Sequence, residues 1–154
     1  MIALIIDFVN LLLAALLVGI MFGVWLFLKP TGLDAKSYVA LQQQAIRTMN
    51  KVMPALGAAT ILVTIIAAVF GRDERARFGL LLAAASCLVT IGLITRFLNQ
   101  PINAIMLTWR AEAPPSNWTN LRDDWWRWHL LRLITGLMGL SLLIAATLKR
   151  VCNG

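Results

Sequence analysis

The segment LLRLITGLMGLSLLIAATL, Leu130–Leu148, is apolar along its whole length apart from one arginine and a few small hydroxyl residues. A helix needs about 20 such residues to cross a bilayer. Three further windows have the same character, with approximate limits at residues 2–28, 52–70 and 78–98. Four spans occupy most of the 154 residues. We therefore predict a single transmembrane domain over residues 1–154 of an integral, multi-pass membrane protein.

The overall composition supports this class. Hydrophobic residues make up 60% of the chain, charged residues make up 14%, and the mean hydropathy is +0.78, which is too apolar for an ordinary soluble domain. Neighbouring spans are antiparallel because each crosses the membrane once, so the predicted fold class is an all-α, integral membrane four-helix bundle. We call side A the membrane side with both termini and residues 71–77. Side B carries the longer connection between the third and fourth helices, residues 99–128.

The net charge of +7 does not indicate nucleic-acid binding, because the basic residues flank the spans and form no continuous stripe. The expected partner is the lipid bilayer. On side A we predict a flanking-charge role for Arg72, Arg75, Arg77, Lys149 and Arg150. The chain has no P-loop, no dinucleotide fingerprint and no Cys/His cluster with zinc spacing, so we predict no metal site. Membrane orientation stays undecided, because several side B arginines are candidates for a pocket.

Gly19 and Gly23 form a G-x-x-x-G motif in the first span. Small residues four apart let helices approach closely in lipid. We expect this face to pack within the chain, with a homo-oligomer through the Gly19/Gly23 face as the alternative.

Polar side chains gather on one face near the side B end of three helices, when residues are placed at 100° intervals. The three sets are Gln43, Arg47, Asn50 and Pro54; Arg96, Asn99, Gln100 and Asn103; and Arg122, Trp125, Trp126, His129 and Arg132. Glycines continue these faces towards side A, at positions 57, 92 and 136. Together the faces predict a polar pocket that tolerates an anion and lies beneath aromatic side chains.

An interfacial belt is the competing interpretation, because tryptophan and arginine commonly anchor helix ends. It is favoured for Trp109, Trp118 and Trp128, although Trp109 is also a candidate pocket residue. It does not explain Arg132 and Arg96, since a charge within a span is costly and usually faces an interior. The nearest carboxylates in the sequence, and hence the candidate partners, are Asp123, Asp124 and Glu112.

Three motifs resemble the anthrone oxygenase-like family of small four-helix membrane proteins: NQPIN (residues 99–103), PPSNW (114–118) and LRDDWWRWHLLR (121–132). Residues 38–54 resemble the family more loosely. The positions that match the family pattern are Asn99, Pro101, Asn103, Trp109, Trp118, Arg122, Trp126, His129 and Arg132.

The resemblance implies a cofactor-independent monooxygenase that uses O2 as co-substrate and converts the activated methylene of an anthrone, a hydrophobic aromatic ketone, into a carbonyl. Enolates and carbanions can react with O2 without a metal. His129 is the candidate general base, because its unperturbed pKa of about 6.5 lies near neutrality. Arg132 and Arg96 are candidates for stabilising the enolate oxygen, and Trp125 and Trp126 for stacking on the substrate. The further substrate-binding candidates are Gln43, Arg47, Asn50, Asn99, Asn103, Trp109 and Arg122.

Other functions stay open at this point. His129 is a candidate axial ligand of haem, although one histidine cannot build a His-rich metal site. A non-catalytic membrane module or complex subunit that binds a lipid, quinone or phenolic ligand needs the same pocket without a base. A transporter or channel is a further alternative, but the chain shows no inverted repeat.

Overall fold

The computed structural model describes residues 1–27 and 32–153, with the side chains of residues 152 and 153 left out. The predicted end of the first span, Leu28, lies outside the described residues. The described elements, in chain order, are α1 (Ile2–Phe27), α2 (Ala35–Phe70), α3 (Arg75–Ile94), the π-helix η1 (Thr95–Asn99), α4 (Gln100–Met106) and α5 (Trp118–Asn153). All of the regular secondary structure in this part of the chain is helical, apart from one isolated bridge between Arg110 and Ala113.

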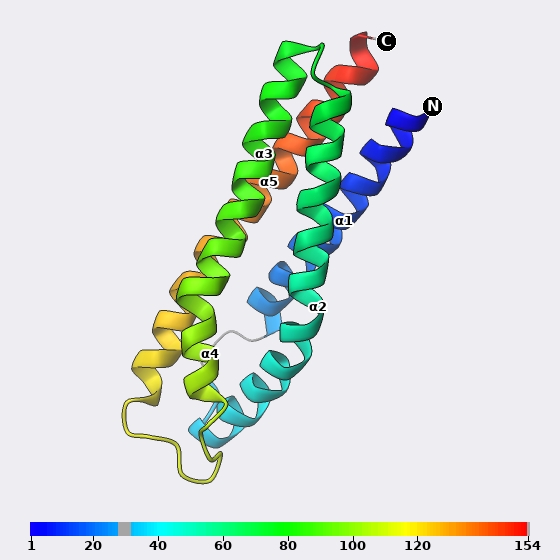
Figure 1. Ribbon diagram of the computed structural model, residues 1–154. Coiled ribbons are helices and arrows are strands. Elements are labelled where there is room, and N and C mark those ends of the chain that lie inside the picture. Colours follow the sequence, from blue (N-terminus) through cyan, green and yellow to red (C-terminus); the bar gives the residue numbers. More distant parts are fainter. Residues whose placement is uncertain (28–31, 154) are drawn as a thin grey trace.

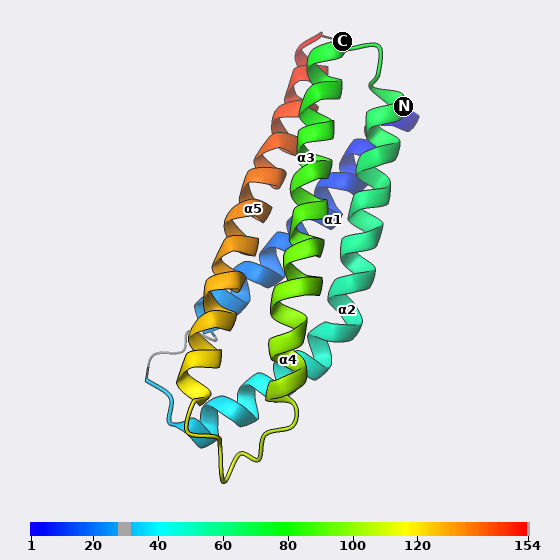
Figure 2. The ribbon, with the colours of Figure 1, turned by 60° about the vertical axis from the view of Figure 1, so that its left-hand side comes forward.

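Figures 1 and 2 show α1, α2, α5 and the continuous α3–η1–α4 body running side by side as an antiparallel bundle. Within the described residues, four helical bodies are long and apolar enough to cross a membrane. Both termini and the α2–α3 turn lie at one end, and residues 107–117 form the longer connection at the other. The predicted four-helix membrane bundle is therefore confirmed, with sides A and B as defined above.

The second helix begins at Ala35, well before its apolar window at residue 52. Its first turn is capped by Asp34, whose Oδ1 accepts a hydrogen bond from the Ser37 backbone N–H at 2.9 Å. This bond holds the pKa of the Asp34 carboxyl below its ordinary value. The helix continues through Pro54, which has no N–H to offer the carbonyl of Asn50, and α2 changes direction along its length (Figure 1).

Small buried side chains line the helix contacts in the side A half of the bundle. Each of the four long helices contributes one alanine with a relative exposure of 0–1%: Ala14, Ala67, Ala84 and Ala146. Small side chains of this kind allow helix backbones to approach closely in a membrane. The side B half holds longer side chains and the cavities described below.

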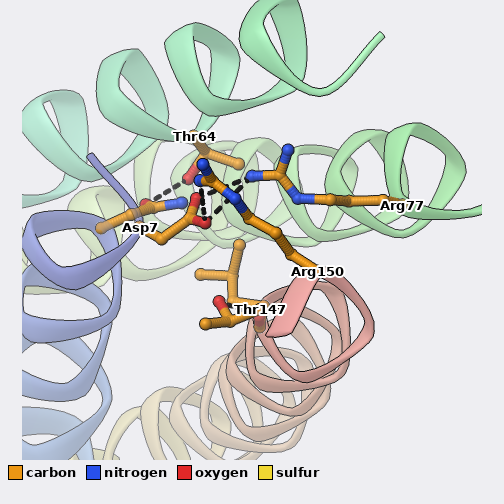
Figure 3. A network of polar contacts seen from close by, with 7 residues as sticks. Asp7, Thr64, Arg77, Thr147 and Arg150 are labelled. Atoms are coloured by element: carbon orange, nitrogen blue, oxygen red, sulfur yellow. Dashed lines mark hydrogen bonds and ion pairs between the residues drawn. The ribbon is translucent and has the colours of Figure 1, made fainter. Parts of the chain in front are cut away.

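A buried ionic cluster ties the helices together at side A (Figure 3). Arg77 of α3 donates from Nη2 to both carboxylate oxygens of Asp7 at 2.8 and 3.0 Å, and Arg150 of α5 donates to Asp7 Oδ2 at 2.9 Å. Nearby, Thr64 Oγ1 donates to Asn10 Oδ1 at 2.8 Å and so joins α1 to α2. The predicted flanking role is wrong for Arg77, because its side chain is only 2% exposed and it neutralises a buried carboxylate.

The Gly19/Gly23 face does not pack closely within the chain as expected. A Cβ atom placed on Gly19 or Gly23 meets no described atom within 4 Å. The helices approach through the alanines of the side A half instead. The homo-oligomer through this face stays a prediction.

Candidate functional site

A small cavity of about 60 Å³ lies among α1, α2, η1, α4 and α5 in the side B half. Six polar side chains line it, namely Gln42, Asn50, Thr95, Gln100, Asn103 and Arg132, together with the imidazole of His129. The remaining wall is apolar and includes Met21, Ile46 and Trp125. The structure thus brings His129, Arg132, Asn50, Asn103 and Trp125 together, as the polar faces in the sequence predict.

His129 is held through both ring nitrogens. Nε2 lies 3.1 Å from the carbonyl oxygen of Met21, and Nδ1 lies 3.0 Å from Nη2 of Arg132. A guanidinium can only donate, so Nδ1 accepts, and Nε2 carries the proton that is donated to Met21. The ring is 1% exposed. This geometry defines a neutral imidazole whose one free lone pair faces an arginine.

Arg132 is partnered without a carboxylate among the described residues. Its second donated bond goes from Nη1 to Thr95 Oγ1 at 3.2 Å, and its Nε has no partner there. The carboxylates suggested by the sequence pair elsewhere, Asp123 with Arg122 at 2.8 Å and Asp124 with Arg127 at 3.7 Å. Arg132 therefore brings an uncompensated positive charge to the cavity wall, which favours an anionic or electron-rich ligand.

Trp125 orients the histidine ring and fastens α5 to its neighbours. Its indole stacks on His129 with centroids 5.2 Å apart and planes within 2°. Its Nε1 donates to Asn103 Oδ1 at 2.7 Å, and its carbonyl accepts from Asn99 Nδ2 at 3.2 Å. Trp126 contacts the same ring at 5.7 Å in a tilted arrangement. Both indoles therefore contact His129 itself.

Gln42 is a candidate site residue that the sequence reasoning missed. Its side chain is 2% exposed and lines the cavity, and neither its Nε2 nor its Oε1 has a hydrogen-bond partner in the described structure. A buried amide without partners costs about 1–3 kcal/mol. Such a group is satisfied when a ligand supplies a donor and an acceptor. The signal in the sequence is the apolar face that Gln42 shares with Ile46, Met49 and Met53.

The neighbouring Gln43 has a different position. Its Nε2 donates to the carbonyls of Met106 and Trp109, both at 2.9 Å, and so ties α2 to the end of α4 and the following loop. Trp109 packs in the apolar cluster around Tyr38 and Trp118.

The remaining candidates lie at the rim or outside the cavity. Asn50 accepts from Gln100 Nε2 at 2.9 Å at the exposed rim. Arg47 is exposed and does not line the cavity. Arg122 lies over the Trp118 ring at 5.0 Å and pairs with Asp123, and neither Arg122 nor Trp118 lines the cavity.

A larger cavity of about 460 Å³ adjoins the first towards the middle of the bundle. The two cavities share Met21, Met53, Pro54, Thr95, Gln100 and Arg132 in their walls. The larger one is mainly apolar, and Gly57, Gly92 and Arg96 also line it. Its volume falls within the range of about 300–1,000 Å³ that is typical of small-molecule sites.

Two irregular stretches of backbone flank these cavities. Pro54 lines both of them from α2, and Thr95, the first residue of η1, lines both from the facing helix. The facing helix is irregular just before Pro101, because all five residues of the π-helix η1 precede Gln100 and Pro101 at the start of α4. A π-turn contains an extra residue, so Arg96 and Asn103 no longer share one face. Arg96 turns to the larger cavity and Asn103 to the smaller.

Metal ligands do not cluster in the part of the chain that the structure describes, where no three His, Cys, Asp or Glu residues come together. The polar groups of the smaller cavity's wall are a neutral histidine, one arginine, one threonine and several amides.

These features define a class: a multi-pass helical membrane protein with a cavity of ligand size within its bundle. The family model described as anthrone oxygenase matches residues 42–142. The match covers more than half of the chain and all the cavity-lining residues from α2 to α5, and the chain belongs to this family. Among curated proteins and among solved structures, none matches the chain.

Proposed function

We propose that the protein is a cofactor-independent oxygenase that converts the activated methylene of a hydrophobic, anthrone-like phenolic ketone into a carbonyl. One O2 is consumed for each methylene converted, and its second oxygen atom leaves as water. The observation that carries the proposal is the pair formed by His129 and Arg132, which faces a cavity with an unpartnered amide at Gln42.

The pair supplies both functions that the first step needs. When the ketone oxygen of the substrate accepts the hydrogen bond that Arg132 otherwise donates to His129, the lone pair on His129 Nδ1 becomes free. Nδ1 then accepts a proton from the methylene, while Nε2 keeps its hydrogen bond to the Met21 carbonyl. Arg132 stays on the oxygen where negative charge develops, which is where a fixed donor lowers the barrier most.

The later steps need little from the protein beyond a dry cavity. The electron-rich carbon transfers an electron to O2 and then forms a C–O bond to it, which gives a hydroperoxide after proton return from His129. Loss of water from the hydroperoxide leaves the carbonyl. Gln42 and Asn103 are the neutral groups that orient the polar end of the substrate, and the larger cavity receives its apolar rings.

One observation favours a second candidate function. The Nδ1 lone pair is engaged by Arg132, and a site that only binds a phenolic or quinone ligand needs no free base. In that function Arg132 and Gln42 orient the ligand and His129 is a fixed wall of the cavity.

The decisive experiment is O2 consumption by the purified protein in detergent, offered a panel of anthrones and other acidic phenolic ketones. The oxygenase predicts one O2 consumed per carbonyl formed, at a rate above the spontaneous oxidation. Absence of turnover across the panel, with binding retained, supports the binding module. A visible spectrum of the same sample is the control for haem, because a Soret band would replace the cofactor-free proposal.

A further inference from the structure

Among the described residues, the exposed part of the larger cavity's wall lies on one side of the bundle. Towards α1 and α5 its wall is sealed by Leu17 and Met21 of α1 and by Leu88 and Ile91 of α3, which are 1–6% exposed and cluster with Leu133 of α5. On the other side, four residues of its wall belong to the exposed class: Pro54 and Ala58 of α2, and Gly92 and Arg96 of α3 and η1. These four residues form what we call the α2–α3 opening.

The opening lies at the depth of the bilayer interior. Ala58 and Gly92 each lie roughly six residues, or about 9 Å at 1.5 Å per residue, inside the side B end of their apolar windows. A mouth at this depth faces lipid chains and not water, because the hydrocarbon core is about 30 Å thick.

Helices α2 and α3 do not pack closely against each other at the α2–α3 opening. Small residues normally allow two membrane helices to close together, yet a Cβ atom placed on Gly57 or Gly92 meets no described atom within 4 Å. By contrast, a Cβ on Gly136 lies 2.7 Å from the Met21 side chain, on the sealed side. The bend at Pro54 and the π-helix at Thr95–Asn99 lie at the side B end of the α2–α3 opening and account for the separation of α2 from α3.

The chemistry along the cavity is graded from the opening inward. The wall next to the lipid is apolar apart from Arg96, whose side chain has no ion-pair partner in the described part of the chain. The far end carries Arg132 and adjoins the unpartnered amide of Gln42. A flat, apolar molecule with oxygen atoms at one edge fits this gradient, with its polar edge leading.

We propose that the substrate enters sideways from the bilayer through the α2–α3 opening and reaches the His129–Arg132 pair through the larger cavity. This route rests on the proposed function for the chemical class of the substrate, a fused-ring phenolic ketone dissolved in lipid. The route itself rests on the exposed wall, the depth of the opening and the open space at its glycines. A water-insoluble substrate then never has to leave the membrane.

The test uses anthraquinone, an unreactive fused-ring probe, bound to the full chain in proteoliposomes. Quinones quench indole fluorescence, and of the six tryptophans Trp125 and Trp126 lie beside His129, so the saturable part of the stopped-flow quenching reports arrival at the site. The obstructing variants are Ala58→Phe and Gly92→Phe, two independent changes at one opening. The matched controls are Ala55→Phe and Ala83→Phe, exposed positions on the same helices that line neither cavity.

An obstructed entrance slows both the entry and the exit of a ligand without changing the bound state. We expect each obstructing variant to lower the association and dissociation rates together by about tenfold, with an almost unchanged dissociation constant, while both controls behave as the original chain. Unchanged rates in a folded obstructing variant overturn the proposal, as does weakened affinity at an unchanged association rate. Failure of the original chain to bind anthraquinone overturns it too. O2 consumption measured in parallel separates the two proposals. If the obstructing variants slow anthraquinone binding but the original chain consumes no O2, only the oxygenase proposal is refuted.

Discussion

Arg132 donates a hydrogen bond to Nδ1 of His129, its neighbour one helical turn away, and so occupies the lone pair on which base catalysis depends. With Nε2 bonded to Met21, the ring has one tautomer available and no rotation that improves its contacts. His129 can therefore act as a base only when Arg132 donates its hydrogen bond to another acceptor. The arrangement therefore couples deprotonation to the arrival of an electron-rich oxygen.

This arrangement predicts the tautomer of the ligand-free protein. His129 is the only histidine in the chain, so selective nitrogen-15 labelling of histidine gives one ring to observe. We expect a protonated Nε2 and an unprotonated Nδ1 at neutral pH, measured by NMR in detergent or lipid. A protonated Nδ1 would contradict the hydrogen bond from Arg132.

Replacement of His129 by glutamine separates the chemical role from the structural one. A glutamine amide can still donate to the Met21 carbonyl, but it cannot take up a proton. We expect anthrone-dependent O2 consumption to fall by at least about a hundredfold, the usual contribution of a general base, while anthraquinone binding changes little. Full activity in both His129→Gln and His129→Ala would show that the base assignment is wrong.

Adjacent glutamines on α2 provide a matched pair of stability changes with opposite sign. Gln42→Leu removes a buried amide that has no partner among the described residues, so we expect a more stable ligand-free protein and weaker anthraquinone binding. Gln43→Leu leaves the carbonyls of Met106 and Trp109 without their donor and should destabilise by about 1–3 kcal/mol.

Chemical denaturation in micelles measures both glutamine variants in the same way. If Gln42→Leu is as destabilising as Gln43→Leu, then the Gln42 amide is not free for a ligand.

The bundle was predictable because apolar length alone identifies membrane spans, and the polar faces of α5 were predictable because that helix is regular through His129 and Arg132. Residues 35–51 also read as a helix that runs into the second span, and α2 does begin at Ala35. The sequence singled out Gln43, whereas Gln42 is the glutamine that lines the smaller cavity. Counting polar residues alone selects the face with the most of them, whereas the buried face mixes one amide with apolar neighbours.

Contacts between distant segments account for most of what the sequence did not reveal. A π-helix adds a residue to one turn, so angles counted at 100° per residue place Arg96 and Asn103 together when they face different cavities. The partner of Arg77 lies 70 positions away at Asp7, and no local pattern connects them. The cavity itself depends on how far apart the helices stay, which is a property of the packed bundle.

The Asp7 cluster predicts a large stability effect far from the site. Asp7 is 4% exposed and accepts from Arg77 and Arg150, so Asp7→Asn leaves the 2% exposed Arg77 without its counter-charge. Loss of one partner of a buried ion pair costs about 3–5 kcal/mol.

Arg150→Gln is the matched control and should cost less, because the Arg150 side chain is 22% exposed and its removal leaves the Asp7–Arg77 pair intact. Denaturation in micelles gives both values, and O2 consumption per folded molecule should stay unchanged in each. Equal losses of stability in the two variants would mean that the cluster does not depend on neutralising Arg77.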